Sequence, residues 1–186
     1  MTTPLTLSKR LSILFTAAAL VLASNASHGL SVTASAGSDY YSVDVTQPIL
    51  PRLRAGVGYL NTDDADIYTG SLMFAPITPV VDLTIGARYQ YQDTDFGEGG
   101  GVSVGGSAFV GTPIPMVSVG GHGFYTPEDL THGDLEESYE YAAQVRARLT
   151  PQTYASASYR FVRSDFDGTG RQTLHSGPVF GVSVGF

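Results

Sequence analysis

The sequence predicts an all-β protein, a closed antiparallel transmembrane β-barrel, and three observations lead to that prediction. Apolar and polar residues alternate along short runs, short proline-rich connections alternate with longer acidic ones, and the chain ends on an apolar strand with a terminal phenylalanine. Alternation indicates strands with two unlike faces. Because a soluble sandwich would alternate in the same way with its apolar face inside, the other two observations decide between the two folds.

Residues 1–26 are expected to be a cleavable signal peptide, and residues 27–186 the barrel. Lys9 and Arg10 give a positive start, an apolar stretch follows over residues 11–23, and the small Ser24 and Ala26 offer a cleavage site. That apolar stretch is shorter than the roughly 20 residues that a membrane-spanning helix needs. We therefore expect an export signal and no helical anchor.

Composition excludes several classes of protein. The chain has no cysteine, so disulfides, a lipid-modified cysteine and thiolate metal sites are all excluded. Lys9 is the only lysine, so after removal of the signal every basic residue is an arginine and the remaining chain is clearly acidic. An acidic chain is a poor partner for the phosphates of nucleic acid.

The strand pattern is clearest in residues 81–91, where odd-numbered positions are apolar or aromatic and even-numbered positions are polar or glycine. A tilted membrane strand needs about 9–11 residues, which this run supplies. Runs of the same kind give the full set of expected strands: 30–36, 41–45, 53–59, 68–74, 81–91, 102–110, 117–125, 139–149, 155–161 and 180–186. We therefore predict a barrel of about eight to ten strands, with ten favoured because bacterial barrels have even numbers.

The connections between these runs alternate in character. Short ones at 47–51, 76–79, 112–115 and 150–153 hold most of the prolines, whereas 61–66, 93–100, 126–137 and 164–176 are longer and rich in Asp and Glu. Outer-membrane barrels have short periplasmic turns and long external loops. The sequence therefore predicts both termini and the proline-rich turns in the periplasm, with the acidic loops outside the cell.

Aromatic residues gather near the ends of the expected strands and are candidates for the interfacial girdles of a membrane barrel. Ordinary strand preference for tyrosine would explain them equally well. They are Tyr40, Tyr41, Tyr59, Tyr68, Phe74, Tyr89, Tyr91, Tyr125, Tyr139, Tyr141, Tyr154 and Phe186.

The last strand carries apolar residues at Phe180, Val182, Val184 and Phe186, the final residue. This ending resembles the C-terminal signal that the barrel-assembly machinery reads in outer-membrane proteins. Together with the export signal and the unequal connections, it favours the membrane barrel over the sandwich.

Four segments resemble the YfaZ family of outer-membrane proteins. They are residues 35–48 (SAGSDYYSVDVTQP), 58–64 (GYLNTDD), 118–129 (SVGGHGFYTPED) and 159–167 (YRFVRSDFD), which follow one another through nearly all of the mature chain. The resemblance implies a small barrel in the outer membrane of a Gram-negative bacterium, with no established activity and no catalytic residues to carry over.

Charged residues on the inward faces of the expected strands form the main candidate site. They are Asp44, Arg54, Asp82, Arg88, Glu140, Arg146, Arg148 and Arg160. Buried guanidinium groups need partners, and their planar fork suits bidentate contact with carboxylates. We expect this network to fill and stiffen the interior. The alternative is that an anion binds or passes where arginines outnumber carboxylates.

Two other kinds of site were weighed. Residues 93–95 and 165–170 offer clustered carboxylates to a divalent cation, although neither follows an EF-hand pattern, and solvated external loops are the preferred interpretation. His122 would face inward beside Ser118 with Glu128 and Asp129 close in sequence, as a membrane-embedded hydrolase would need. A structural role is preferred for this histidine too.

The sequence thus predicts a non-enzymatic outer-membrane protein, structural or narrowly pore-forming, with no metal or cofactor. The alternatives are a binding or adhesion protein that uses its external loops and, less favoured, a lipid- or peptide-cleaving enzyme. Expected partners are outer-membrane lipid, lipopolysaccharide and, during biogenesis, the barrel-assembly machinery and periplasmic chaperones. Nucleic acid is not expected.

Overall fold

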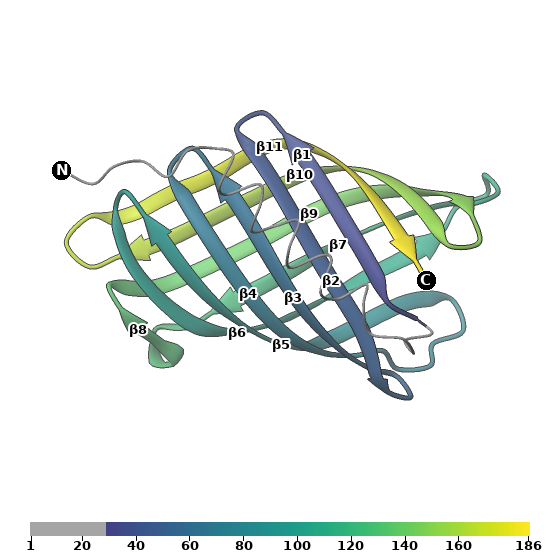
Figure 1. Cartoon of the computed structure of the whole chain (residues 1–186), viewed down its shortest axis with the longest axis horizontal. Helices are drawn as coiled ribbons and strands as arrows, with labels where there is room; N and C mark the ends of the chain where they lie inside the picture. The colour runs from purple at the N-terminus through teal and green to yellow at the C-terminus, as the bar shows by residue number, and fades with distance from the viewer. Residues whose placement is uncertain (1–28) are drawn as a thin grey trace.

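Ten long antiparallel strands close into a single barrel in the computed structural model, which describes residues 29–186 (Figure 1). The expected signal peptide lies outside the described residues. Each long strand pairs with the next one along the chain, and β1 pairs with β11 to close the cylinder. Since closure leaves no unpaired edge, every strand has two hydrogen-bonded neighbours, as lipid requires.

The strands have the following bounds: β1 Ser31–Gly37, β2 Tyr40–Leu50, β3 Leu53–Thr62, β4 Ala65–Phe74, β5 Val81–Thr94, β6 Gly97–Gly111, β7 Val117–Thr126, β9 Leu135–Thr150, β10 Thr153–Phe166 and β11 Gly170–Gly185. Between β7 and β9 lie a short 3₁₀ helix, η1 (Glu128–Leu130), and the three-residue strand β8 (Thr131–Gly133), which pairs with the start of β6. The barrel itself therefore has ten strands, and the favoured count is confirmed.

The ten expected strands are all present, but most are longer than the alternation indicated. The predicted loops at 61–66, 93–100 and 164–176 are largely strand, because β3, β5 and β10 continue into tight turns and return as β4, β6 and β11. Only the β7–β9 connection is a long excursion in the described chain. The prediction of long loops at residues 61–66, 93–100 and 164–176 was wrong, whereas the prediction that these segments lie at one end of the barrel is correct.

An apolar core inside one end of the barrel explains these extensions. Its members point inward from six strands: Tyr40, Leu60, Ala65, Ile67, Leu135, Val162, Phe166, Leu174 and Val179, with Phe96 packed against them. Phe166 is 1 % exposed and Val162 is 2 % exposed. Burying such side chains stabilises the hairpins beyond the membrane, so the strands do not need lipid to remain paired.

The exterior is that of a membrane protein. Outward side chains such as Val57, Leu72, Ile85 and Val145 are exposed although apolar. From residue 81 to residue 91, a strand tilted by about 40° rises roughly 25 Å, which is the height of the apolar band on a transmembrane barrel. No helix among the described residues is long and apolar enough to cross a membrane.

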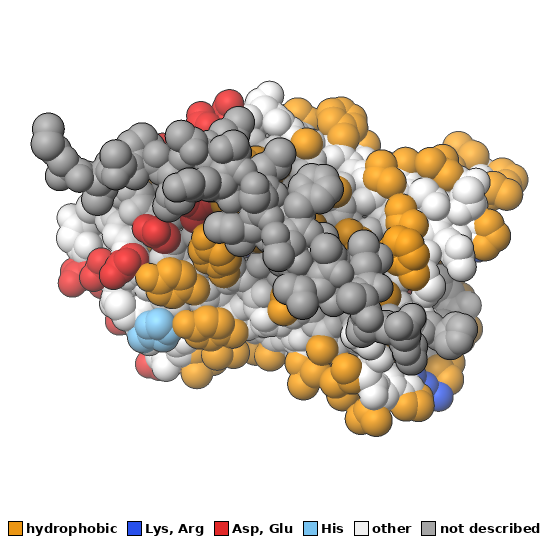
Figure 2. Space-filling view, in the orientation of Figure 1, with side chains coloured by type: hydrophobic (Ala, Val, Ile, Leu, Met, Phe, Trp, Pro, Cys, Tyr) orange, Lys and Arg blue, Asp and Glu red, His pale blue; other side chains and the backbone are white. Residues whose placement is uncertain are grey.

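The two ends of the barrel differ in charge, and this sets the orientation. Figure 2 shows Asp and Glu gathered at the end where β8 lies, whereas hydrophobic side chains cover the opposite end. The chain ends at the hydrophobic end, where Gly29 N–H donates to the Phe186 carbonyl oxygen at 2.7 Å (Figure 1). With the hairpins and the β7–β9 excursion outside, the acidic end is extracellular and the proline-rich end is periplasmic.

Outward tyrosines form a girdle at the extracellular side of the apolar band. The rings of Tyr41, Tyr59 and Tyr68 follow one another across β2, β3 and β4, with centroids 5.9 and 5.1 Å apart. Further round, Tyr91 donates to Glu98 at 3.2 Å and Tyr125 donates to Glu137 at 2.6 Å. Outward rings whose hydroxyls reach acidic residues, as in Tyr91 and Tyr125, have the geometry of an interfacial girdle.

Two of the aromatic residues predicted for the girdles lie elsewhere. Tyr40 is 3 % exposed and belongs to the internal core, because it alternates with the outward Tyr41. Tyr154 pairs in register with the inward Ser183, and the guanidinium of Arg148 lies 5.4 Å from its ring. Both assignments to the girdle were wrong, since proximity to a strand end does not say on which face a residue lies.

Candidate functional site

Glu140 is the centre of a charged cluster inside the barrel. Its carboxylate accepts a hydrogen bond from Arg88 Nη2 at 2.9 Å and another from Arg160 Nη2, and His122 Nε2 lies 2.9 Å from Oε1. The side chains of Glu140, Arg88 and Arg160 are 6, 11 and 14 % exposed. Two guanidinium groups and one imidazole therefore share a single buried carboxylate.

Strand alternation brings these residues together from three neighbouring strands and from β5, which is separated from them by β6. Arg88 is on β5, His122 on β7, Glu140 on β9 and Arg160 on β10, each at an inward position. Arg88 reaches Glu140 across the lumen, and its guanidinium lies 4.2 Å from the centre of the Phe124 ring, a cation–π contact. The cluster thus links β5 to β9 and β10, strands that are not paired with β5 in the sheet.

Two further contacts complete this layer. Arg160 Nη1 donates to the Tyr40 hydroxyl, and Arg88 Nη2 also donates to Gln90 Oε1 at 3.1 Å. The Nε atoms of Arg88 and Arg160 are buried without a hydrogen-bond partner among the described residues. Since each unpaired buried donor costs free energy, the layer depends on the Glu140 carboxylate.

A buried polar network lies on the extracellular side of this cluster. Gln92, which is fully buried, donates from Nε2 to Ser138 at 3.1 Å and accepts from Ser164 at 2.8 Å. Next to it, Gln90 donates to Thr126 at 3.1 Å, and the Thr126 and Ser103 hydroxyls are 2.7 Å apart. Together with the apolar core beyond it, this network fills the lumen across the extracellular half.

The periplasmic half of the lumen is different. Apart from the buried Phe109 and the Arg146 side chain that stacks on it, most of its inward positions carry small side chains that are half-buried: Ser31, Thr33, Ser35, Thr46, Thr69, Ser71, Thr84, Ser107, Ser156, Ser158 and Ser183. On the extracellular half Ser103, Thr126, Ser138 and Ser164 are each 2 % exposed or less. The periplasmic half of the lumen is therefore less tightly filled than the extracellular half, and we call this half, which ends at the Glu140 cluster, the vestibule.

Only part of the predicted charge network is one site. Arg146 pairs with Asp82 at 2.7 Å and stacks 3.5 Å above the Phe109 ring, in the vestibule and apart from Glu140. Arg54 and Arg148 are exposed at the periplasmic mouth. Asp44 is half-buried in the lumen, where its carboxylate lies close over Gly58. Inward direction was predictable from alternation, but the height of each residue along the barrel was not.

The geometry separates the residues considered for a hydrolase. His122 contacts Glu140, while Ser118 accepts from Arg146 Nε at 3.2 Å. Glu128 and Asp129 are exposed in η1, at the extracellular end, outside the lumen. The segments weighed for a cation gather no group of three His, Asp or Glu side chains within residues 29–186.

Sequence reasoning did not find Tyr40, His122 or Gln92 as members of the internal network. Alternation could have placed Tyr40 inward, because Ser42 and Asp44 follow it at the same parity. For Gln92 the signal was weaker, because it lies beyond the end of the strand expected at residues 81–91. Its burial depends on the extended hairpins, which the pattern did not indicate.

A comparison with protein families decides the affiliation, because a family model described as YfaZ precursor matches residues 9–186. The chain belongs to the YfaZ family. The predicted resemblance is thereby confirmed, and the closed barrel with its apolar exterior makes this YfaZ protein an integral protein of the outer membrane. No curated protein shows significant sequence similarity to it.

Several solved structures share features of the fold with this YfaZ protein at low sequence identity. A NanC porin matches with a TM-score of 0.44 and 13 % identity, over 84 % of this chain and 98 % of the porin. A bacterial polysaccharide outer membrane secretin matches with a TM-score of 0.44 and 15 % identity, over 79 % of this chain and 56 % of that one. The translocator domain of autotransporter NalP from Neisseria meningitidis matches with a TM-score of 0.36 and 13 % identity, over 96 % of each chain.

Proposed function

We propose that this YfaZ protein is a sealed, non-enzymatic barrel that strengthens the outer membrane and does not pass solutes. One observation carries the proposal: the inward side chains of the extracellular half are buried, from Glu140 at 6 % exposed to Gln92 at 0 %. A porin needs a continuous water-filled path, which this filling interrupts. The vestibule below the Glu140 cluster is then a blind chamber.

The chemistry of the seal supports a barrier to ions as well as to larger solutes. An ion moving outward from the vestibule would have to separate Glu140 from Arg88 and Arg160 and then cross the apolar core around Phe166. Removing a charge from water costs several kcal/mol per ion even after the protein relaxes, by order-of-magnitude reasoning. The pairing of both Arg88 and Arg160 with Glu140 favours closure over a path for anions.

A non-enzymatic role is supported by how the candidate groups are engaged. General-base catalysis requires the base to contact its nucleophile, and His122 instead contacts the Glu140 carboxylate within an ion cluster. Lipopolysaccharide around the outer girdle and phospholipid around the inner rim are the partners that this exterior suits. During biogenesis, the exposed Phe186 side chain at the end of the last strand is available to the assembly machinery.

Single-channel recording in a planar bilayer tests the proposal. The protein would be purified from outer membranes of cells that express the full chain, and folding would be checked by the heat-dependent shift in gel mobility. Folded wild-type protein should give no discrete conductance steps in concentrated salt, beside a general porin recorded as positive control. Regular steps that scale with salt concentration would show a continuous path and refute the sealed barrel.

A further inference from the structure

The four proline-rich periplasmic turns carry large apolar side chains that face away from the barrel. Ile77, Val80 and Met116 are 73, 76 and 72 % exposed, and Leu50 and Ile114 are 61 and 63 % exposed. We call residues 48–52, 75–80, 112–116 and 149–152 the periplasmic rim. An ordinary solvated turn would carry polar residues at these positions, so their exposure requires an explanation.

Charge is nearly absent from this rim. It contains no Asp or Glu and a single arginine, Arg52, whereas the extracellular hairpins carry most of the acidic residues of the chain. In Figure 2 the contrast between the two ends is visible as orange against red. A region without carboxylates can enter a low-dielectric environment without burying charge if its single arginine, through its long side chain, reaches the phospholipid headgroups.

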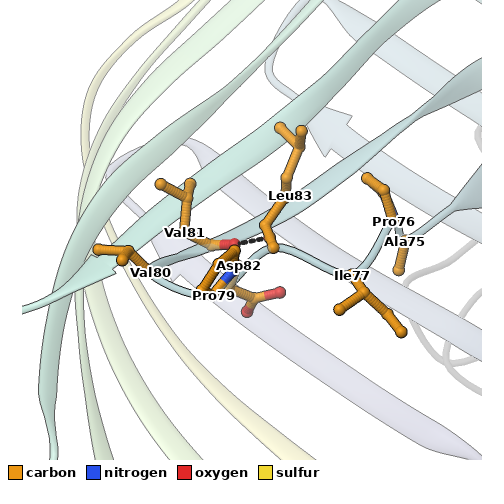
Figure 3. A pocket seen from close by; sticks show the side chains of 9 residues that line it. Ala75, Pro76, Ile77, Pro79, Val80, Val81, Asp82 and Leu83 are labelled. Carbon is orange, nitrogen blue, oxygen red and sulfur yellow. Dashed lines mark hydrogen bonds between the residues drawn. The ribbon is translucent and has the colours of Figure 1, made fainter.

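Part of the backbone of the rim is hydrogen-bonded within the protein, and part has no N–H to satisfy. Seven of the ten prolines of the chain lie here, and proline has no N–H to satisfy. Thr112 accepts from Ile114 N–H at 3.2 Å and donates to the Val117 carbonyl oxygen at 3.1 Å, while Thr78 donates to the Val81 carbonyl oxygen (Figure 3). Backbone groups in turns that leave water need such hydrogen-bond partners within the protein, because lipid acyl chains offer none.

At β5 the rim continues the apolar band of the strand without an outward polar residue in between. Val80 directly precedes β5, whose first outward residues are Val81 and Leu83. Figure 3 shows Val80 and Ile77 extending in different directions from the turn. The four turns join β2 to β3, β4 to β5, β6 to β7 and β9 to β10, so they are distributed around the barrel wall. A surrounding bilayer can contact all four turns at once, whereas a single protein partner would cover one side.

From this exposed apolar rim, which has no carboxylate and a single arginine, we infer a lipid-binding surface: the apolar side chains of the periplasmic turns insert among the phospholipid acyl chains of the inner leaflet. The occupant is phospholipid and not periplasmic water or a protein. The barrel then lies deep in the membrane, with its periplasmic mouth at the level of the phospholipid headgroups and its acidic hairpins standing clear outside. This inference is independent of whether the lumen conducts.

Tryptophan fluorescence tests the inference without background, because the chain has no tryptophan. Ile77→Trp and Ile114→Trp would report on two turns, Val57→Trp on the middle of the apolar band, and Asp63→Trp on the extracellular β3–β4 turn. Each full-length variant would be purified from outer membranes, reconstituted in phosphatidylcholine vesicles with or without brominated acyl chains, and exposed to acrylamide. The gel-mobility shift would confirm folding.

We expect Ile77→Trp and Ile114→Trp to behave like Val57→Trp, with blue-shifted emission, a severalfold loss of intensity in brominated lipid and little effect of acrylamide. Asp63→Trp should show the reverse. Quenching of both rim variants by acrylamide to the level of Asp63→Trp would place the rim in water and overturn the inference. Protection from both quenchers would mean that protein covers the rim, and would overturn it equally. The two turns are tested independently, so one unfolded variant leaves the test intact.

Discussion

Replacing Glu140 by alanine should destabilise the barrel more than any other change of a single charge in the lumen. The substitution removes the carboxylate that Arg88 and Arg160 share and leaves two guanidinium groups that are 11 and 14 % exposed without an ion-pair partner, with only the longer-range charge of Asp44 to offset them. Removing one partner of a buried ion pair costs about 3–5 kcal/mol. Because two arginines lose their partner at once, the upper end of that range is expected.

Asp82→Ala is the matched control. Asp82 pairs with Arg146 at 2.7 Å, but the two side chains are 65 and 26 % exposed, so water replaces the lost carboxylate. Exposed ion pairs contribute only about 0–1 kcal/mol. The two substitutions should therefore differ by at least about 2 kcal/mol in the free energy of unfolding.

Urea titration of the protein in phospholipid vesicles would measure this difference, with circular dichroism and gel mobility of unheated samples as the two readouts. A triple variant, Glu140→Leu with Arg88→Met and Arg160→Met, should recover much of the loss, because apolar groups of similar size can replace a buried ion cluster. Equal destabilisation by Glu140→Ala and Asp82→Ala would refute the reasoning. So would a triple variant no more stable than Glu140→Ala.

Three further predictions follow from packing and hydrogen bonding. Gly106→Ala should destabilise the barrel by about 1–3 kcal/mol, because the new Cβ would lie 2.0 Å from the Thr84 carbonyl oxygen. The control is Gly70→Ala, which has open space around it and should be neutral or slightly stabilising in the same urea titration. Gln92→Leu should cost about 1–3 kcal/mol by leaving the Ser138 and Ser164 hydroxyls without their amide partner, and an unchanged unfolding midpoint would contradict the polar network. Phe186→Ala should leave the stability of the purified barrel nearly unchanged, because the side chain is 55 % exposed, yet lower the amount assembled in cells; normal assembly, measured by blotting of outer-membrane fractions, would exclude Phe186 from the assembly signal.

Much of the fold was predictable from period-two alternation alone. Inward and outward faces of strands such as β5 follow directly from residue parity, and an even strand number with unequal connections selected the closed barrel. The apolar core at the extracellular end was not predictable. Members such as Ala65 and Phe166 lie in segments where acidic residues suggested solvated loops, and only long-range packing turns those segments into strands.

The candidate site was predictable as a set of inward charges but not as a cluster. Parity places Arg88, Arg146 and Glu140 inside, yet whether two residues meet depends on the stagger between strands around the barrel. That stagger sets Arg88 beside Glu140 across the lumen and Arg146 beside Asp82 in a separate layer. The stagger cannot be derived from a single sequence. The sequence therefore predicted one charge network, whereas the structure contains two separate groups.

Cysteine labelling tests the central claim, a lumen open to the periplasm and sealed towards the outside, most directly. The chain has no cysteine, so Ser156→Cys in the vestibule and Ser164→Cys in the buried polar network each introduce one inward thiol on β10. The folded variants in vesicles would be treated on both sides with a water-soluble maleimide. Our account predicts rapid labelling of Ser156→Cys, and labelling of Ser164→Cys only after unfolding in urea. Equal labelling of the two folded variants would contradict it.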